Sequence, residues 1–218
     1  MTSEEFVRDL KQHNERLLAK LDAAPEVTPA GDPRAGLAPL LKAALKNEAE
    51  AAAIAAEWVG STPELEAKLA LARHAGDEAR HYQLLEERVR ALGLPLADWD
   101  PLTPPSPVLQ FLRSLSTTEE RIAAALVARE AMGGRRNVQF LRYLEAVGQP
   151  EIARLYRQVI NPDEDRHHAA GCALLARLAT SPEAQARARA AAVRLLEIGD
   201  QARDHFLRST GATVMPGC

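Results

Sequence analysis

The chain has 218 residues, of which 46% are hydrophobic, 26% are charged and only 4% are aromatic. Alanine and leucine predominate, and both favour helices, whereas β-rich domains need more aromatic and β-branched residues. The composition therefore predicts an all-α fold. A net charge of −3 without a long basic run gives no reason to expect nucleic-acid binding, although a local RNA contact stays open.

The sequence contains no sign of a membrane or secreted protein. No apolar stretch approaches the roughly 18–20 residues that a membrane span needs. The N-terminus, MTSEEFVRDLKQ, is polar and acidic, unlike a secretory signal. Cys172 and Cys218 do not form the pattern of a disulfide framework. We therefore expect a cytoplasmic protein.

Hydrophobic periodicity, capping residues and Gly or Pro breaks divide the chain into helical segments. A Pro/Gly-rich connector is expected over 25–36 and a loose tail after residue 208. The chain then divides into an N-terminal helix with its connector (1–36), a bundle with its last helix (37–208) and a tail (209–218). The expected long helices cover residues 3–23, 37–59, 63–92, 119–147, 151–179 and 182–208.

The connections between these helices differ in length. Short breaks at 60–63 and 148–150 each separate two helices. Residues 93–118 instead contain five prolines, which predict a long crossover with one short helix inside it. Helices joined by short loops pack antiparallel. Two helical hairpins joined by a long crossover predict a four-helix bundle, here with an extra helix at each end of the chain.

Two copies of the pattern D-E-x-R-H occur, DEARH at 77–81 and DEDRH at 163–167. Chance alone would supply far less than one copy in a chain of this length, so the repetition indicates a shared role. Glu78 and His81 are three residues apart and share one helix face, as do Glu164 and His167. Each pair can converge on one cation, and two such helices placed face to face can hold two.

Two further carboxylates, Glu48 and Glu130, are in phase with the apolar stripes of the other two bundle helices. A carboxylate on a core-facing stripe is costly unless it is paired or bound to metal. Glu48 precedes Glu78 by 30 residues and Glu130 precedes Glu164 by 34, which suits antiparallel hairpins. The predicted metal ligands and catalytic residues are therefore Glu48, Glu78, His81, Glu130, Glu164 and His167.

These predicted ligands are four carboxylates and two imidazoles, so two divalent ions would balance the carboxylate charge. The set suits iron or manganese, and no thiolate joins it to favour zinc or an iron–sulfur cluster. We expect two iron ions, with Mn/Fe and Mn/Mn pairs as alternatives. Such a site would leave open positions for dioxygen or peroxide.

The arrangement E…DEARH…E…DEDRH resembles the ferritin-like di-iron carboxylate superfamily over about residues 37–180. The D-E-x-R-H form is similar to that of bacterial multicomponent monooxygenases and soluble acyl-carrier-protein desaturases. The chain length is closer to small ferritin-like proteins, including tRNA-modifying di-iron hydroxylases. The resemblance implies a ferritin-like four-helix bundle in which Asp77 and Asp163 hydrogen-bond the ligand histidines across the bundle. Arg80 and Arg166 would pair with buried acids beside them.

His74 lies one turn before Glu78 on the same helix face. It is either an additional polar group of the metal pocket or a histidine whose hydrogen bonds are satisfied in the core. The arginines of the two motifs likewise have a simpler interpretation, as members of surface ion pairs.

The expected function is that of a non-haem di-iron oxidoreductase that activates dioxygen to hydroxylate or oxidise an organic substrate. One alternative is an iron-handling protein, a ferroxidase or peroxide scavenger. Another is a bundle that keeps its metals for stability alone. The expected partners are dioxygen or peroxide, an organic substrate and an external electron donor, while a tRNA substrate and a homodimer are left open.

Overall fold

The computed structural model describes residues 1–22 and 33–217, and all of the regular structure in these residues is helical. This confirms the prediction of an all-α bundle. The longest uninterrupted helices are α1 (Ser3–Asp22), α2 (Pro33–Ser61), α3 (Leu65–Ala91) and α9 (Pro182–Thr210).

Two further long helices are composite, because each contains a π-helical segment. The first runs through α5 (Thr118–Arg121), the π-helix η1 (Ile122–Arg129) and α6 (Glu130–Ala146). The second runs through α7 (Pro150–Leu155), the π-helix η2 (Tyr156–Ile160) and α8 (Asn161–Leu178). The segment η1 ends directly before Glu130, and η2 ends three positions before Asp163. π-Helical turns are frequent at functional sites.

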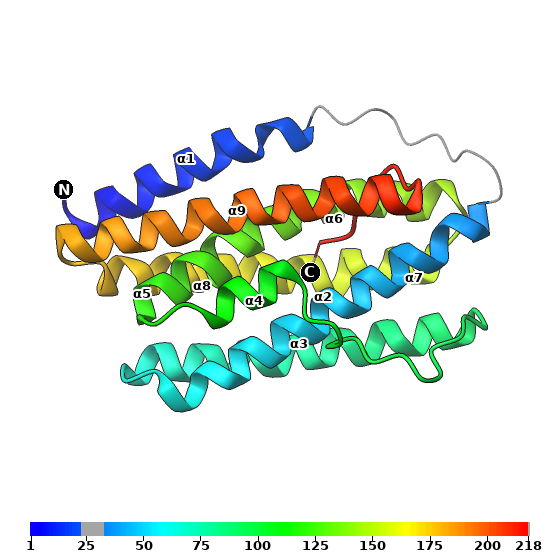
Figure 1. Cartoon of the computed structure of the whole chain (residues 1–218), viewed down its shortest axis with the longest axis horizontal. Coiled ribbons are helices and arrows are strands. Elements are labelled where there is room, and N and C mark those ends of the chain that lie inside the picture. The colour runs from blue at the N-terminus through cyan, green and yellow to red at the C-terminus, as the bar shows by residue number, and fades with distance from the viewer. Residues whose placement is uncertain (23–32, 218) are drawn as a thin grey trace.

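The helices form two hairpins joined by a crossover, as the connection lengths predict. Helices α2 and α3 pack along each other, and α6 packs against α8. The crossover after α3 contains the short helix α4 (Pro107–Arg113). In Figure 1, α9 and α1 lie on the side of the bundle opposite α3, and both contact helices of the second hairpin.

The apolar core consists of two clusters that occupy opposite ends of the bundle. Along α2, the buried apolar residues from Leu37 to Leu45 belong to one cluster and those from Ile54 to Trp58 to the other, with Glu48 between them. Along α3 the order is reversed, with His74 and Glu78 in the middle. The second hairpin repeats this arrangement. The buried polar residues therefore form a layer between two apolar clusters, each of which stabilises the helices that position them.

Two predictions, the extent of the connector and the loose packing of the tail, were wrong. Helix α2 begins at Pro33, so the last part of the predicted connector is helical, which is compatible with proline in a first turn. The other part of the connector, 23–32, lies outside the described residues. The tail is not loose, because Val214 is 2% exposed and the Gly217 N–H donates to Asn137 Oδ1 at 2.9 Å. Asn47 Nδ2 donates to the carbonyls of the tail's last two described residues, at 3.2 Å each.

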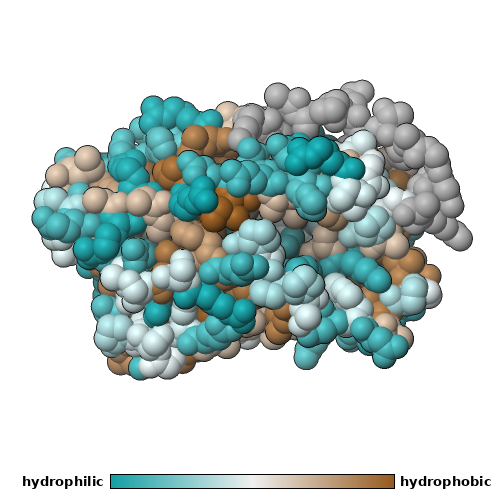
Figure 2. Space-filling model, in the orientation of Figure 1, coloured by the Kyte–Doolittle hydropathy of each residue, from teal (hydrophilic) through white to brown (hydrophobic). Residues whose placement is uncertain are grey.

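Figure 2 shows hydrophilic side chains spread among smaller apolar areas over one face of the molecule. None of the described helices combines the length and the apolar character that a membrane span would require.

Candidate metal centre

All six predicted ligands meet in the polar layer between the two apolar clusters. They come from four helices: α2 carries Glu48, α3 carries Glu78 and His81, α6 begins at Glu130, and α8 carries the remaining two. Together with His74, these residues form two groups, and within each group the ligand atoms lie within 4.8 Å of one another. Glu78 belongs to both groups. One group is Glu48, Glu78, His81 and Glu164, and the other is His74, Glu78, Glu130 and His167.

The two motif histidines direct the same ring nitrogen towards the carboxylates. His81 Nδ1 lies 3.4 Å from Glu48 Oε2 and 3.6 Å from Glu78 Oε2. His167 Nδ1 lies 3.1 Å from Glu78 Oε1 and 3.7 Å from Glu130 Oε2. Glu78 is therefore contacted from both sides, once by the histidine of each D-E-x-R-H motif.

The opposite ring nitrogens are held by the aspartates of the motifs, in a crossed arrangement. His81 Nε2 lies 2.9 Å from Asp163 Oδ2, and His167 Nε2 lies 3.1 Å from Asp77 Oδ2. Each motif thus supplies the aspartate that orients the histidine of the other. A carboxylate on Nε2 keeps the proton there and leaves Nδ1 free to coordinate a cation. The contacts implied by the family resemblance are therefore present.

Both motif arginines contact the same aspartate. Arg166 forms an ion pair with Asp163, and Arg80 Nη1 lies 3.6 Å from Asp163 Oδ2. The family resemblance implied that these arginines pair with buried acids, and Asp163 is buried. Both arginine side chains are themselves mostly exposed. The surroundings of the two aspartates are therefore unequal, although their motifs are alike.

His74 is the member of the cluster that the sequence left undecided. Its Nδ1 lies 3.5 Å from Glu78 Oε1 and its Nε2 lies 3.7 Å from Glu130 Oε1. Its ring packs edge-on against that of His167, with 4.4 Å between ring centres. The spacing H-x3-E-x2-H, with the two histidines two turns apart on one face, is the sequence signal for this third imidazole.

Buried Glu50 and partly buried His168 lie outside the cluster. Glu50 is buried but bonds to Lys46 at 3.0 Å and to the Ser106 N–H at 2.8 Å, so it anchors the crossover. His168 follows a predicted ligand, and its Nδ1 lies 3.0 Å from the carbonyl of Val127. Neither side chain is part of the two groups.

Burial and mutual contact shift the pKa values of several residues in the cluster. Burial raises the pKa of Glu48 to about 8. Burial would also raise the pKa of Glu78, but His74, His167 and His81 together hold it well below its usual value. Burial favours the neutral form of His81, yet Glu48 and Glu78 raise its pKa to about 10.

The other two histidines of the cluster respond differently from each other. The Glu130 and Glu78 carboxylates overcome the burial of His167 and raise its pKa to about 10. For His74, burial dominates and lowers the pKa. Without bound metal the cluster therefore holds protons on some of its imidazoles and on Glu48 at neutral pH, and a bound cation must displace them.

The donor atoms of the cluster fit two divalent cations. Glu48, Glu78 and Glu130 are at most 2% exposed, and their carboxylate oxygens make no hydrogen bond to any described residue. The Nδ1 atoms of His74, His81 and His167 are likewise buried without a hydrogen bond inside the described part of the chain. Such groups are costly to bury unless a cation satisfies them. The set of oxygen and imidazole donors could hold two ions, without identifying the metal.

Comparison of the chain with protein-family models, with curated proteins and with solved structures finds no match.

Proposed function

We propose that the protein is a non-haem di-metal oxidoreductase, with two iron ions, that uses dioxygen to oxidise a small organic substrate. The observation that carries the proposal is the convergence of buried carboxylates and three buried histidines, from four helices, on the shared residue Glu78. We propose also that the chain is a distant member of the ferritin-like di-iron carboxylate superfamily. The two motifs, their crossed aspartate contacts and the long crossover support this membership.

The chemistry is divided between the bound ions and the protein. The two ions would supply the electrons and the open coordination positions that dioxygen chemistry needs. Asp163 and Asp77 hold the Nε2 protons of the two motif histidines, so that Nδ1 of each ring stays a metal donor. The apolar clusters on either side of the polar layer keep bulk water from the ligands.

A cavity beside the cluster favours an organic substrate over the alternative of iron handling alone. It has a volume of about 120 Å³ and reaches His74 and His167. Leu126, Ala70 and Ala170 supply apolar lining. A site that held metal for stability only, or oxidised ferrous ions only, would have no need of an apolar pocket at its ligands.

The test is to load the protein anaerobically with ferrous ion, measure bound iron, and then add dioxygen. We expect two iron ions per chain and a transient visible absorption that appears in the presence of dioxygen. Glu48→Gln should lose at least one ion, whereas Glu57→Gln, an exposed change on the same helix, should retain both. Rapid turnover of excess ferrous ion with no oxidation of any added organic compound would support the ferroxidase instead. Failure of the wild-type protein to bind two ions would refute the proposal.

A further inference from the structure

We propose that substrate approaches the candidate centre from the side of His74 and His167, and that Arg73 at the mouth of this cavity selects small molecules bearing a carboxylate. The inference rests on the proposed function, because it names the substrate class of the same site. It is carried by the position of the cavity, its size and the charges around it.

The cavity reaches one of the two ligand groups and not the other. His74 and His167, which border it, are 3% and 7% exposed and belong to the group that includes Glu130. The residues found only in the second group, such as Glu48 and His81, do not line the cavity. A molecule in the cavity would therefore meet the His74 group first.

The volume limits what can enter. The cavity measures about 120 Å³, and an apolar cavity of roughly 150 Å³ holds one benzene molecule. The space therefore suits a small organic acid or the end of a longer one. A larger cavity of about 320 Å³ lies between the end of α3 and the start of α7, but no candidate ligand borders it.

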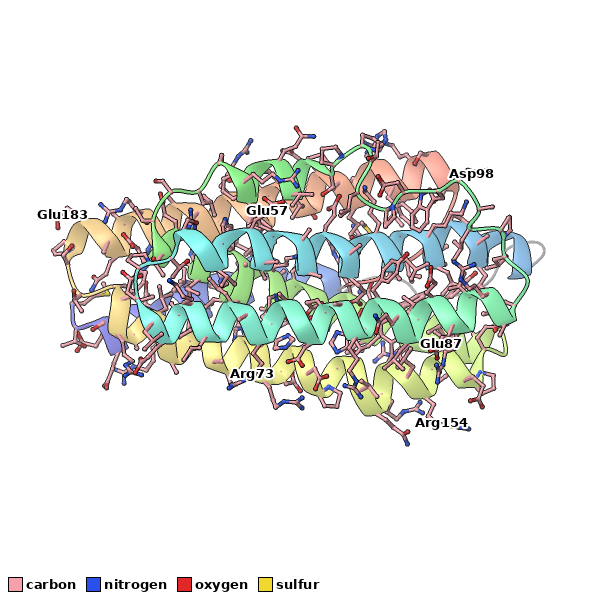
Figure 3. The ribbon with its side chains drawn as sticks, turned by 90° about the horizontal axis from the view of Figure 1, so that it is seen from below. Glu57, Arg73, Glu87, Asp98, Arg154 and Glu183 are labelled. Atoms are coloured by element: carbon pink, nitrogen blue, oxygen red, sulfur yellow. The ribbon has the colours of Figure 1, made fainter. Side chains whose placement is uncertain are left out.

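Among the described residues, one cation at the mouth of the cavity has no ionic or hydrogen-bonding partner. Asp77 is engaged by His167, and Arg166 is engaged by Asp163 and by the carbonyl of Pro162. Arg73 borders the same cavity, is exposed, and makes no ion pair or hydrogen bond with any described residue. In Figure 3, Arg73 lies on the side of α3 that faces α8.

A guanidinium that is not already paired is suited to a carboxylate, because its N–H groups match the two carboxylate oxygens. With Arg73 binding the carboxylate, the rest of a small acid would extend along Leu126 towards His74 and His167. Asp77 beside the same cavity would disfavour a dianion, so a monocarboxylate is preferred over inorganic phosphate.

The test uses the full chain loaded with zinc, which is redox-inactive, and measures dissociation constants by saturation-transfer NMR. The probes are propionate, its neutral isostere propionamide, and inorganic phosphate. The variants are Arg73→Gln and Arg73→Glu. The control is Arg177→Gln, which likewise removes one positive charge from the α3–α8 pair. Arg177 forms an ion pair with Glu66 and does not line the cavity. Bound zinc is measured in every sample.

We expect propionate to bind the wild-type protein more tightly than propionamide or phosphate. Arg73→Glu should raise the dissociation constant of propionate roughly threefold to tenfold, a range set by the modest strength of exposed ion pairs. Arg177→Gln should leave the dissociation constant unchanged. Equal binding of propionate and propionamide, tighter binding of phosphate, or an unaffected Arg73→Glu protein would overturn the inference.

The zinc content separates this inference from the proposed function. If the protein takes up two zinc ions but shows no preference for propionate, only the substrate class is wrong. If the protein binds neither zinc nor ferrous ion, the proposed metal centre fails, and the same titrations on the metal-free protein still decide whether the cavity prefers a carboxylate.

Discussion

Oδ2 of Asp163 lies 2.9 Å from Nε2 of His81, so that an aspartate of the second D-E-x-R-H motif orients the histidine of the first. The reciprocal contact joins Asp77 to His167 at 3.1 Å. The two contacts differ in their surroundings, because the side chain of Asp163 is 5% exposed and that of Asp77 is 30% exposed. Two arginines further restrain Asp163.

Asp163→Asn should therefore weaken metal binding more than Asp77→Asn. Loss of a carboxylate behind a ligand histidine typically costs about 10- to 100-fold in metal affinity. We expect Asp163→Asn to lie near the upper end of that range and Asp77→Asn near the lower end. Titration against a chelator of known affinity measures both. Wild-type affinity in the Asp163 variant would show that the contact has no role in metal binding.

His74→Ala should affect one ion and spare the other. His74 belongs to only one of the two ligand groups, and the other group contains a single histidine, His81. We expect the variant to retain one tightly bound ion and to lose or loosen the second, as measured by metal analysis after dialysis. The matched control is His168→Ala, which removes a neighbouring histidine that contacts Val127 and Cys172. If His74→Ala retains two ions as firmly as the control, His74 is not a ligand.

The stability of the protein should depend on pH in opposite ways with and without metal. In the metal-free protein the pKa values of His81 and His167 are raised to about 10 and that of Glu48 to about 8. A raised pKa in the folded state adds stability below the unfolded pKa, and this stability is lost as pH rises through the folded pKa. The metal-free protein should therefore become less stable between pH 6 and pH 8.

The metal-loaded protein should become more stable over the same interval, because fewer protons compete for the ligands. Urea unfolding midpoints at pH 6, 7 and 8, with and without Mn²⁺, measure the two slopes. Parallel slopes would mean that the raised pKa values and the metal site do not involve the same groups.

Two glycines of the second hairpin should respond to alanine in opposite directions. A Cβ on Gly171 would lie 2.5 Å from Leu126 Cβ, so α8 and η1 approach too closely for a side chain there. Gly171→Ala should cost about 1–3 kcal/mol in the free energy of unfolding. At Gly134 a Cβ would meet nothing within 4 Å, so Gly134→Ala should stabilise the helix by up to about 1 kcal/mol. Urea denaturation compares them, and equal effects would argue against the close contact at Gly171.

The helices could be predicted from sequence because their limits are local. Ser181 and Pro182 mark the start of α9, and Gly211, with φ +69°, follows its end. The metal ligands could be predicted because phase and motif select the same residues. Glu48 and Glu130 occupy core-facing positions that an uncompensated carboxylate would avoid, and both are now placed in the cluster.

Other features depend on contacts between distant parts of the chain, which local sequence patterns cannot predict. The tail reaches Asn47 and Asn137, far away in sequence, and a Cβ on Gly217 would lie 2.2 Å from the Gly133 carbonyl. The π-helical segment η1 packs against α9 and α8, which come much later in the chain. His74 remained undecided because its phase fits either a ligand or a core histidine.

The central claim is that two ions bind around Glu78. Anomalous diffraction from crystals of the iron-loaded protein, recorded at the iron edge, tests it most directly. We expect two peaks, one among Glu48, His81 and Glu164 and one among His74, Glu130 and His167, with Glu78 contacting both. Absence of iron from this layer, or a single ion held by residues outside these groups, would contradict the account.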